Sequence, residues 1–282
     1  MAVKQKDNAL GYKLLLFIYK ILGYKTVSIV LNFIALYYVI FAREVKKDLQ
    51  SYYDHQGIPL SNYMFFKHIK TFANSLLDRF VSRIDPESFE YHGVDEELLD
   101  VLREKGGLVL LSHVGGWASS THNLQTKNLP QMNVVMQDNT NESMQEVEEN
   151  TKNNEKKNVN IIDLNIGAFA ANIQIANVLM QNEIVAMMAD RVANEKRFIE
   201  VSFFGSQVKI NKDPFDIAKR MDKPIIIVHT INKGERKYDA LYFEIPTQRS
   251  SIEETAQFYM DVLEDTLRKH PQQWFNFYDY FK

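Results

Sequence analysis

The sequence lacks cysteine altogether, and with it several kinds of chemistry. Without thiols the chain of 282 residues forms no disulfide, has no thiolate-bound metal and has no cysteine nucleophile. None of its seven histidines occurs in an HExxH spacing, and no serine occurs in G-x-S-x-G, so we predict neither a metal centre nor a serine nucleophile. A basic excess is missing as well, because 33 Lys and Arg stand against 36 Asp and Glu. The net charge of −3 therefore predicts no binding to nucleic acid.

Positive charge and apolar residues are concentrated together in the amino-terminal part. Residues 1–47 carry eight Lys and Arg against two acidic residues, a net charge of +6, and the rest of the chain carries −9. The charge-free run 26–42, 17 residues long, is at the lower limit for crossing a bilayer, whereas the tyrosines and lysines around it suit a helix in the headgroup region. A buried core helix of a soluble protein also fits. A cleavable signal peptide does not, because no small-residue cleavage site follows.

Hydrophobic periodicity predicts an α/β fold for most of the chain. Residues 61–84 have apolar positions every three or four residues, as in a helix, and 251–271 open with a capping-box spacing and end at a proline. Five short apolar runs, GGLVLLS, MNVVMQD, NVNIIDL, EIVAMMAD and KPIIIVHT, alternate with helical patterns, which favours a sheet covered by helices on both faces. We divide the chain into a membrane-associated helical segment, 1–60, and an α/β domain, 61–282. The polar stretch 138–160 is expected to be an exposed helix and loop, or a lid over the site.

One histidine occupies a position typical of a reactive group. His113 follows the apolar strand GGLVLLS directly, and ligands of open α/β sheets bind at the carboxyl ends of strands. Gly115 and Gly116 allow close approach of a substrate to the backbone, and a helix expected from about Trp117 directs its N–H groups toward the same place. A histidine at a strand end also occurs for structural reasons alone, so this pattern by itself leaves catalysis open.

Four motifs in order resemble one enzyme family. LSHVGGW resembles the HxxxxD/E motif of the lysophospholipid acyltransferase superfamily, in the bacterial lipid A lauroyl/myristoyl branch, where HxGNWE is typical. MMADRVANEKRFIEVSFFG resembles that branch's D(Q/R) segment leading to FFG or FLG, and KDPFDIAKRMDKPIIIVHT its GPxxLAxxxxxPV stretch. HPQQWFNFYDYF is similar to its HPEQWFWFHRRF ending. The resemblance covers nearly the whole chain and implies a glycerolipid acyltransferase-like mixed sheet flanked by helices, with an apolar helical segment that associates with the membrane.

The resemblance implies transfer of a fatty acyl group to a hydroxyl or amine of a lipid, on the cytoplasmic face of a bacterial inner membrane. The donor is then a thioester of acyl carrier protein or coenzyme A, a substrate and not a resident cofactor, and the partners are membrane lipids and this donor. His113 would take the acceptor's proton, backbone N–H groups near Gly115 and Gly116 would stabilise the oxyanion, and Asp190 and Arg191 match the D(Q/R) pair. Arg191 suits a phosphate or carboxylate of a substrate, with Asp190 holding it in place. The implied catalytic pair is His113 and Asp190, and the implied substrate-binding residues are Gly115, Gly116, Trp117, Arg191, Phe204 and Gly205.

The sequence departs from the family's pattern at the motif acid. The family has an acid five residues after the histidine, where this chain has Ala118, and alanine neither accepts the Nδ1 proton nor stabilises imidazolium. Three explanations fit: an engineered inactivation, a substitute acid such as Asp190 or Asp138, each expected at the end of a neighbouring strand, or a divergent relative. A divergent relative would bind lipid without catalysis or transfer a non-fatty acyl group, such as an amino acid or an aromatic polyene acid. The aromatic residues of the HPQQWFNFYDYF segment are expected to pack on the core or to touch lipid, and core packing is the simpler expectation.

Overall fold

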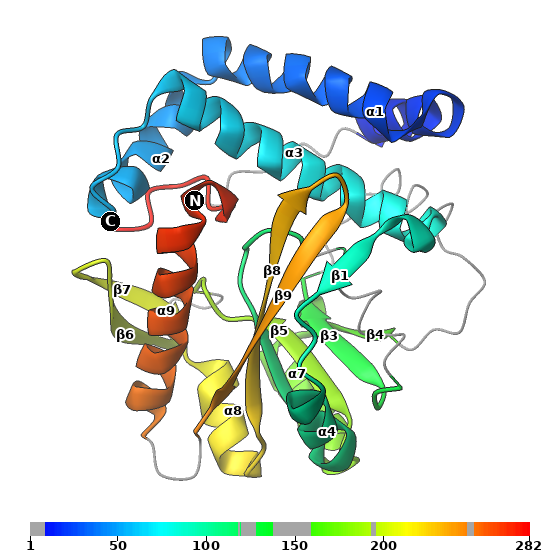
Figure 1. The fold of residues 1–282 in the computed structure, drawn as a ribbon. Coiled ribbons are helices and arrows are strands. Elements are labelled where there is room, and N and C mark those ends of the chain that lie inside the picture. The colour runs from blue at the N-terminus through cyan, green and yellow to red at the C-terminus, as the bar shows by residue number, and fades with distance from the viewer. Residues whose placement is uncertain (1–8, 118, 120–127, 138–158, 193–195, 247–250) are drawn as a thin grey trace.

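The structure, a computed structural model, has a seven-stranded mixed sheet at its centre (Figure 1). It describes residues 9–117, 119, 128–137, 159–192, 196–246 and 251–282. All neighbouring strands of the sheet are parallel except β8 and β9, and β6 and β7 form a separate antiparallel hairpin. In spatial order the sheet comprises β1 (Glu90–His92), β9 (Lys237–Ile245), β8 (Ile225–Gly234), β2 (Gly107–Leu111), β5 (Ile184–Met188), β3 (Met132–Met136) and β4 (Val159–Asp163), and the hairpin comprises β6 (Phe198–Phe203) and β7 (Ser206–Asn211).

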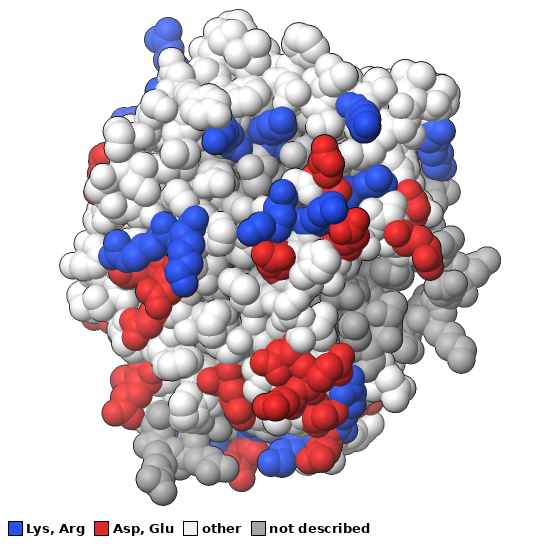
Figure 2. Space-filling model, in the orientation of Figure 1, with Lys and Arg blue, Asp and Glu red and all other residues white. Residues whose placement is uncertain are grey.

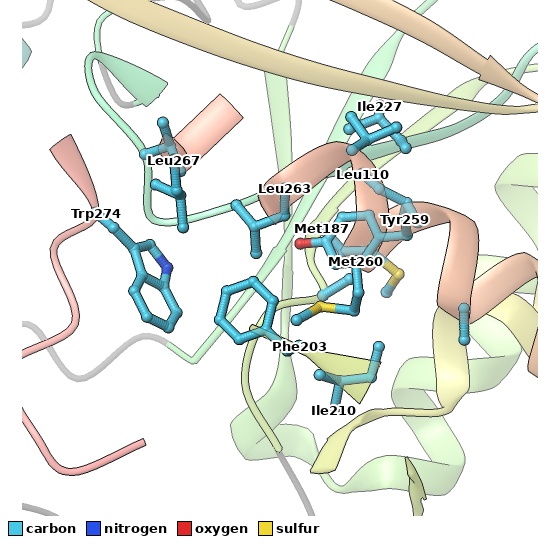
Figure 3. Packing of buried hydrophobic residues seen from close by; sticks show 14 of the residues in the cluster. Leu110, Met187, Phe203, Ile210, Ile227, Tyr259, Met260, Leu263, Leu267 and Trp274 are labelled. Carbon is cyan, nitrogen blue, oxygen red and sulfur yellow. The ribbon is translucent and has the colours of Figure 1, made fainter. Parts of the chain in front are cut away.

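Helices cover both faces of the sheet, as the sequence predicts. Along β2, Leu108 and Leu110 pack with α7, α8 and α9, whereas Val109 and Leu111 pack with α4 on the opposite face. Figure 3 shows part of the larger cluster, in which α9 side chains such as Met260 lie on the side chains of the strands. The described helices are α1 (Ala9–Phe41), α2 (Arg43–His55), α3 (Asn62–Ile84), α4 (Glu96–Lys105), α7 (Ala168–Met180), α8 (Asp213–Met221) and α9 (Ile252–Lys269), with short 3₁₀ turns η1 (Pro86–Ser88), η2 (Leu164–Ile166) and η3 (Pro271–Gln273).

The predicted helices and strands are found close to their expected limits. The five predicted strands are β2, β3, β4, β5 and β8, and the mixed α/β fold class is confirmed. The helix expected over 61–84 is α3, whose amino terminus is capped by Ser61, and the capping box of α9 is made by Ser251 and Glu254. Residues 138–158 of the polar stretch lie outside the described residues, and 159 and 160 begin β4, so its interpretation as a lid or solvated loop stays a prediction.

The long amino-terminal helix lies along α3 and not inside the protein (Figure 1). Val27 and Leu31 of α1 pack on Leu77 and Val81 of α3, while the side chain of Phe33, on the opposite face of α1, is 68% exposed. Among the described residues Lys13–Phe41, which is kinked at Gly23, is long and apolar enough by length and composition to cross a membrane, and only 17% of its apolar window is buried. The alternative of a buried core helix is therefore wrong, because α1 contributes one face only to the core.

The second helix joins the amino-terminal segment to the same core as the sheet. Leu49, Tyr52 and Tyr53 of α2 are buried in the cluster that contains the strands and α9. Tyr52 Oη donates to the Pro271 carbonyl at 3.0 Å. The boundary at residue 60 stays a prediction, and residues on its two sides pack against each other.

Candidate active site

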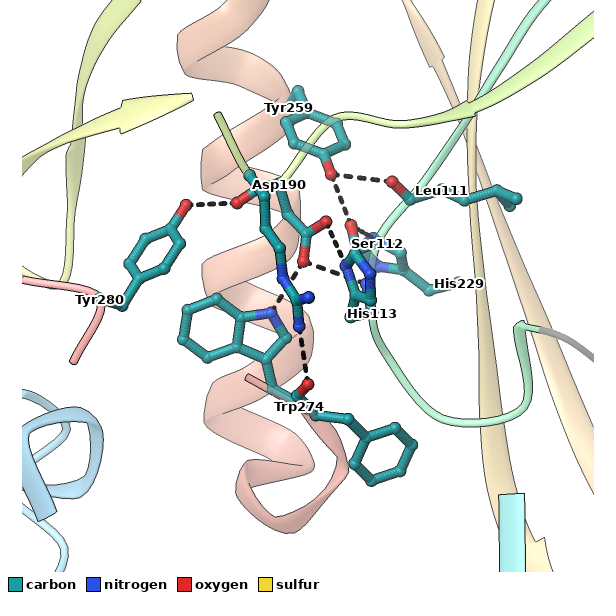
Figure 4. A network of polar contacts seen from close by, with 10 residues as sticks. Leu111, Ser112, His113, Asp190, His229, Tyr259, Trp274 and Tyr280 are labelled. Carbon is teal, nitrogen blue, oxygen red and sulfur yellow. Dashed lines mark hydrogen bonds and ion pairs between the residues drawn. The ribbon is translucent and has the colours of Figure 1, made fainter. Parts of the chain in front are cut away.

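His113 and Asp190 meet at the carboxyl edge of the sheet. They follow β2 and β5, which are parallel neighbours with Leu111 opposite Met188, so the residues after both strands leave the sheet at the same edge. His113 Nδ1 lies 2.8 Å from Asp190 Oδ1 (Figure 4). Of the two substitute acids suggested by the sequence, Asp190 is thus bonded to the histidine. Asp138 and the motif position Ala118 lie outside the described residues.

The Asp190 carboxylate is fully buried and accepts three hydrogen bonds. Besides the His113 ring, the His113 backbone N–H donates to Oδ2 at 3.0 Å and Trp274 Nε1 donates to Oδ2 at 3.1 Å. Burial acts to raise the pKa of the Asp190 carboxyl, but the charge and hydrogen bonds of His113, with the charge of Arg191, outweigh it and hold that pKa well below its usual range. The carboxylate is therefore ionised at neutral pH.

This pairing also decides which nitrogen of the His113 imidazole carries the proton when the ring is uncharged. An ionised carboxylate only accepts hydrogen bonds, so Nδ1 of His113 carries the proton and Nε2 has the free lone pair. The His113 side chain is 21% exposed, whereas Asp190 is inaccessible. The arrangement is that of a general base held in one tautomer by a buried acid.

The backbone of the loop after β2 is already hydrogen-bonded within the protein. Gly115 N donates to Gln273 O at 2.8 Å and Gly116 N donates to Thr230 O at 2.7 Å. Neither of these two N–H groups therefore points to a substrate in this structure, and oxyanion stabilisation by backbone donors near Gly115 and Gly116 stays a prediction. Both glycines are needed for packing: a Cβ on Gly115 would lie 2.0 Å from Thr230 O, and one on Gly116 would lie 2.1 Å from the Tyr238 ring.

Two other predicted substrate contacts lie beside the dyad. The backbone is helical at Trp117, and the Trp117 ring is 6.0 Å from the His113 ring, edge to face. Arg191 Nη2 donates to Phe275 O at 2.8 Å, and the guanidinium lies 5.6 Å from the Tyr278 ring centre. The expected pairing of Arg191 with the Asp190 carboxylate is not what holds it in place, because that carboxylate bonds His113 and Trp274. Arg191 Nε is buried and has no hydrogen-bond partner among the described residues.

Phe204 and Gly205 form the tight turn of the β6–β7 hairpin. Both have positive φ, +48° and +78°, as a two-residue turn of this hand requires. Phe204 is buried against Tyr52 and the Arg268 side chain, and its N–H donates to Glu264. Neither residue joins the hydrogen-bonded network of the dyad, so their substrate contact stays a prediction while their part in the turn is plain.

A buried polar network lies behind the dyad and was missed at the sequence level. Ser112 Oγ is 3.1 Å from His229 Nε2 and 2.7 Å from Tyr259 Oη, and His229 Nδ1 is 3.0 Å from Thr266 Oγ1. Ser112 and His229 are each 1% exposed, so this serine and histidine pair is shielded from any substrate. Burial lowers the pKa of His229 to about 4, so its ring is neutral and pairs with neutral hydroxyls.

The aromatic HPQQWFNFYDYF segment contacts the dyad directly, which the sequence did not indicate. Phe275 N donates to His113 O at 2.8 Å, and Tyr280 Oη donates to the Asp190 backbone carbonyl at 2.6 Å. With the indole of Trp274 on the carboxylate, this segment touches both members of the pair (Figure 4). The only sequence signal for these contacts was the presence of tryptophan and tyrosine in the motif. When such side chains are buried, the N–H or O–H group at the ring usually finds a hydrogen-bond partner.

No group of three or more His, Asp or Glu side chains is placed to bind a metal ion in the described part of the chain. Because that part leaves out several stretches of the sequence, the expected lack of a metal stays a prediction.

Comparison with known proteins finds one family model that covers most of the chain. A family model described as bacterial lipid A biosynthesis acyltransferase matches residues 66–282, a range that includes His113, Asp190, Arg191 and Trp274. A search of curated proteins finds no match.

Proposed function

Because the chain belongs to the family of bacterial lipid A biosynthesis acyltransferases, we propose that it transfers a fatty acyl group to a hydroxyl or amine of a lipid, with His113 as general base. The family makes it an acyltransferase of lipid biosynthesis. The donor in the proposal is a thioester of acyl carrier protein or coenzyme A.

The proposed reaction moves one proton through His113. Nε2 takes the proton of the acceptor O–H or N–H while the acceptor atom bonds to the thioester carbonyl carbon. The tetrahedral intermediate then expels the thiolate by cleavage of the C–S bond, and the imidazolium returns the proton to that sulfur. An ester or amide and a free thiol result.

The observation that carries the proposal is the 2.8 Å contact between His113 Nδ1 and Asp190 Oδ1. An ionised carboxylate on Nδ1 selects the tautomer whose Nε2 accepts a proton, and it stabilises the imidazolium formed during the reaction. Asp190, which follows the neighbouring strand β5, thus supplies the carboxylate that Ala118 lacks. This argues for a working base and against a relative that only binds lipid.

Arg191 is proposed to bind an anionic group of donor or acceptor. It stands next to Asp190 in the chain, and the contacts of one nitrogen with Phe275 O and of its face with Tyr278 leave Nε without a protein partner among the described residues. A guanidinium presents a fork of donors that fits phosphate or carboxylate. Oxyanion stabilisation by Gly115 and Gly116 is not part of the proposal.

The proposed location is the cytoplasmic face of the inner membrane. The family is membrane-associated, and the chain has one apolar amino-terminal helix. Figure 2 shows that the top of the molecule, where α1 lies, is largely uncharged, that Lys and Arg gather in the upper half and that Asp and Glu dominate near the bottom. An apolar helix surface next to a region rich in Lys and Arg favours binding of the protein to a membrane that contains anionic lipid.

The test is transfer of radiolabelled palmitate from acyl carrier protein to a membrane lipid extract. We expect His113→Ala to abolish transfer, and Asp190→Asn to lower turnover by about a hundredfold to ten-thousandfold, because asparagine does not hold the same tautomer. The matched control is His92→Ala, which removes an exposed histidine of β1 outside the site.

Ala118→Glu, which restores the motif acid, is expected to add little to transfer while Asp190 is present. Full transfer by Asp190→Asn would contradict the dyad, and full transfer by His113→Ala would contradict the proposed base. Activity from Ala118→Glu alone would mean that Asp190 does not replace the motif acid.

A further inference from the structure

The segment 273–280, here named the clamp segment, makes several polar contacts with the loop that carries His113. Gln273 O accepts from Gly115 N, Phe275 N donates to His113 O, and Trp274 pairs with Val114 as an antiparallel bridge. These backbone bonds hold the loop in place. One contact is of another kind, because Trp274 Nε1 donates to the Asp190 carboxylate itself.

The indole of Trp274 is itself firmly held. It is 1% exposed, and its ring centre lies 5.0 Å from Tyr52, 5.4 Å from Phe203 and 4.7 Å from Tyr280. Aromatic neighbours on several sides leave the indole little rotational freedom. Its N–H group is therefore a fixed donor at 3.1 Å from Oδ2.

A fixed donor on Oδ2 determines the orientation of the carboxylate. Oδ2 accepts from Trp274 and from the His113 backbone, so the remaining oxygen, Oδ1, faces the ring Nδ1. Each N–H bond to the ionised form also favours ionisation, which a buried acid needs. Without the indole N–H, Oδ2 would have a single donor, and the carboxylate would rotate more freely and ionise less readily.

We propose that Trp274 is a positioning residue of the reaction, which acts on His113 through Asp190. It orients the carboxylate so that His113 stays in the Nδ1–H tautomer. The inference rests on the proposed function of the dyad, and it assigns to the aromatic motif a part in catalysis beyond core packing.

Tyr280 provides a matched control within the same segment. Its hydroxyl donates to Asp190 at 2.6 Å, but to the backbone carbonyl and not to the carboxylate. Tyr280→Phe and Trp274→Phe therefore each remove one buried hydrogen bond to the same residue and keep an aromatic ring. Trp274→Phe also leaves a cavity, so a purely structural role predicts that activity falls in each variant only in proportion to its loss of melting temperature.

The experiment compares the full-length variants Trp274→Phe and Tyr280→Phe with the unchanged protein. We expect Trp274→Phe to lower kcat about tenfold to a hundredfold with little change in KM, because a hydrogen bond to a charged group is lost away from the substrate. In ¹⁵N-histidine spectra the His113 signals, assigned by their absence in His113→Gln, should move from the Nδ1–H tautomer toward a mixture. Tyr280→Phe should keep the tautomer and lose much less kcat for each degree by which its melting temperature falls.

Equal kcat losses in the two variants with an unchanged His113 tautomer would overturn the proposal. If Trp274→Phe does not fold, site-specific incorporation of 3-benzothienylalanine at residue 274 replaces the N–H by sulfur in a ring of nearly the same shape, with the same expected outcome. His113→Ala and Asp190→Asn separate the two possible failures. If these two variants keep activity, the proposed function fails. If they lose activity and Trp274→Phe keeps it, only the inference about Trp274 fails.

Discussion

Two buried histidines outside the dyad make the folded protein sensitive to acid. Burial lowers the pKa of His229 to about 4 and that of His68 to about 3. In the unfolded chain both titrate near their ordinary pKa of about 6.5. At pH values between the unfolded pKa and the folded pKa, the unfolded state binds more protons than the folded state. The free energy of unfolding is therefore highest above pH 6.5, and it decreases as the pH falls toward the folded pKa values.

We expect His229→Gln to weaken this pH dependence. At pH 5 the unchanged protein should have lost about 2 kcal/mol of its free energy of unfolding through His229, relative to pH 7.5, and the variant should not show that part. Asp78, whose pKa burial raises to about 6, acts in the opposite direction but equally in both proteins. Urea unfolding at the two pH values measures the difference. His92→Gln, at an exposed site, is the control, and an equal slope in all three proteins would contradict the prediction.

At the residue scale, the sequence predicted which residues follow the ends of strands, but it did not predict contacts between residues far apart in the chain. His113 and Asp190 each follow an apolar run, so parallel pairing was enough to suggest that they meet. Trp274 reaches Asp190 across 84 positions of the chain, and the bonds of Gly115 N and Gly116 N depend on where the clamp segment and β8 lie, respectively. No local pattern encodes these contacts, so the sequence did not reveal that the N–H groups of the two glycines are bonded within the protein.

At the element scale the five central-sheet strands with apolar runs were predictable, and β1, β6, β7 and β9 were not. β2 and β5 are continuous apolar runs, and β3, β4 and β8 contain apolar runs together with polar residues, because strands of a sheet covered on both faces are largely apolar on both sides. β6 and β7 alternate buried and exposed residues in a hairpin, and β9 does so in its first half, so polar residues interrupt the apolar ones in all three strands. The short edge strand β1 has only three residues and no apolar run.

The turns offer a direct test of close packing. We expect Gly115→Ala to prevent stable folding or to lower the free energy of unfolding by several kcal/mol, since its Cβ would lie 2.0 Å from a carbonyl oxygen at φ +55°. Gly205→Ala has the same backbone problem at φ +78° but open space around the Cβ, so we expect a loss of about 1 kcal/mol. Urea denaturation compares them, and equal losses would show that steric contact at Gly115 is unimportant.

The whole molecule has an apolar side formed by α1 and a charged remainder. The outer face of α1, which includes Phe17, Phe33 and Phe41, is exposed, whereas the inner face packs on α3. The sequence identified this segment as membrane-seeking, but it left spanning and lying flat open. Whether the helix spans the membrane or lies flat on it depends on which face of α1 is covered by α3. The amino-acid composition of α1 does not predict this packing.

We expect Phe33→Ser to weaken binding to vesicles of anionic phospholipid by up to about thirtyfold, since a large apolar side chain contributes about 2 kcal/mol when it leaves water. Its melting temperature should change little, because the side chain is 68% exposed. Leu31→Ala, on the inner face, should lower the melting temperature instead. Vesicle co-sedimentation and thermal unfolding separate the two, and strong vesicle binding by Phe33→Ser would place the membrane against another surface.

The order in which the dyad is assembled follows from where its parts lie in the chain. The helix that meets the lipid is made first, His113 and Asp190 follow, and the clamp segment that holds them leaves the ribosome after both. During synthesis the nascent chain therefore has its apolar helix available for the bilayer while the histidine loop still lacks the hydrogen bonds of residues 273–280. A translation product interrupted before residue 273 would therefore carry the apolar helix and both dyad residues without the hydrogen bonds that hold them.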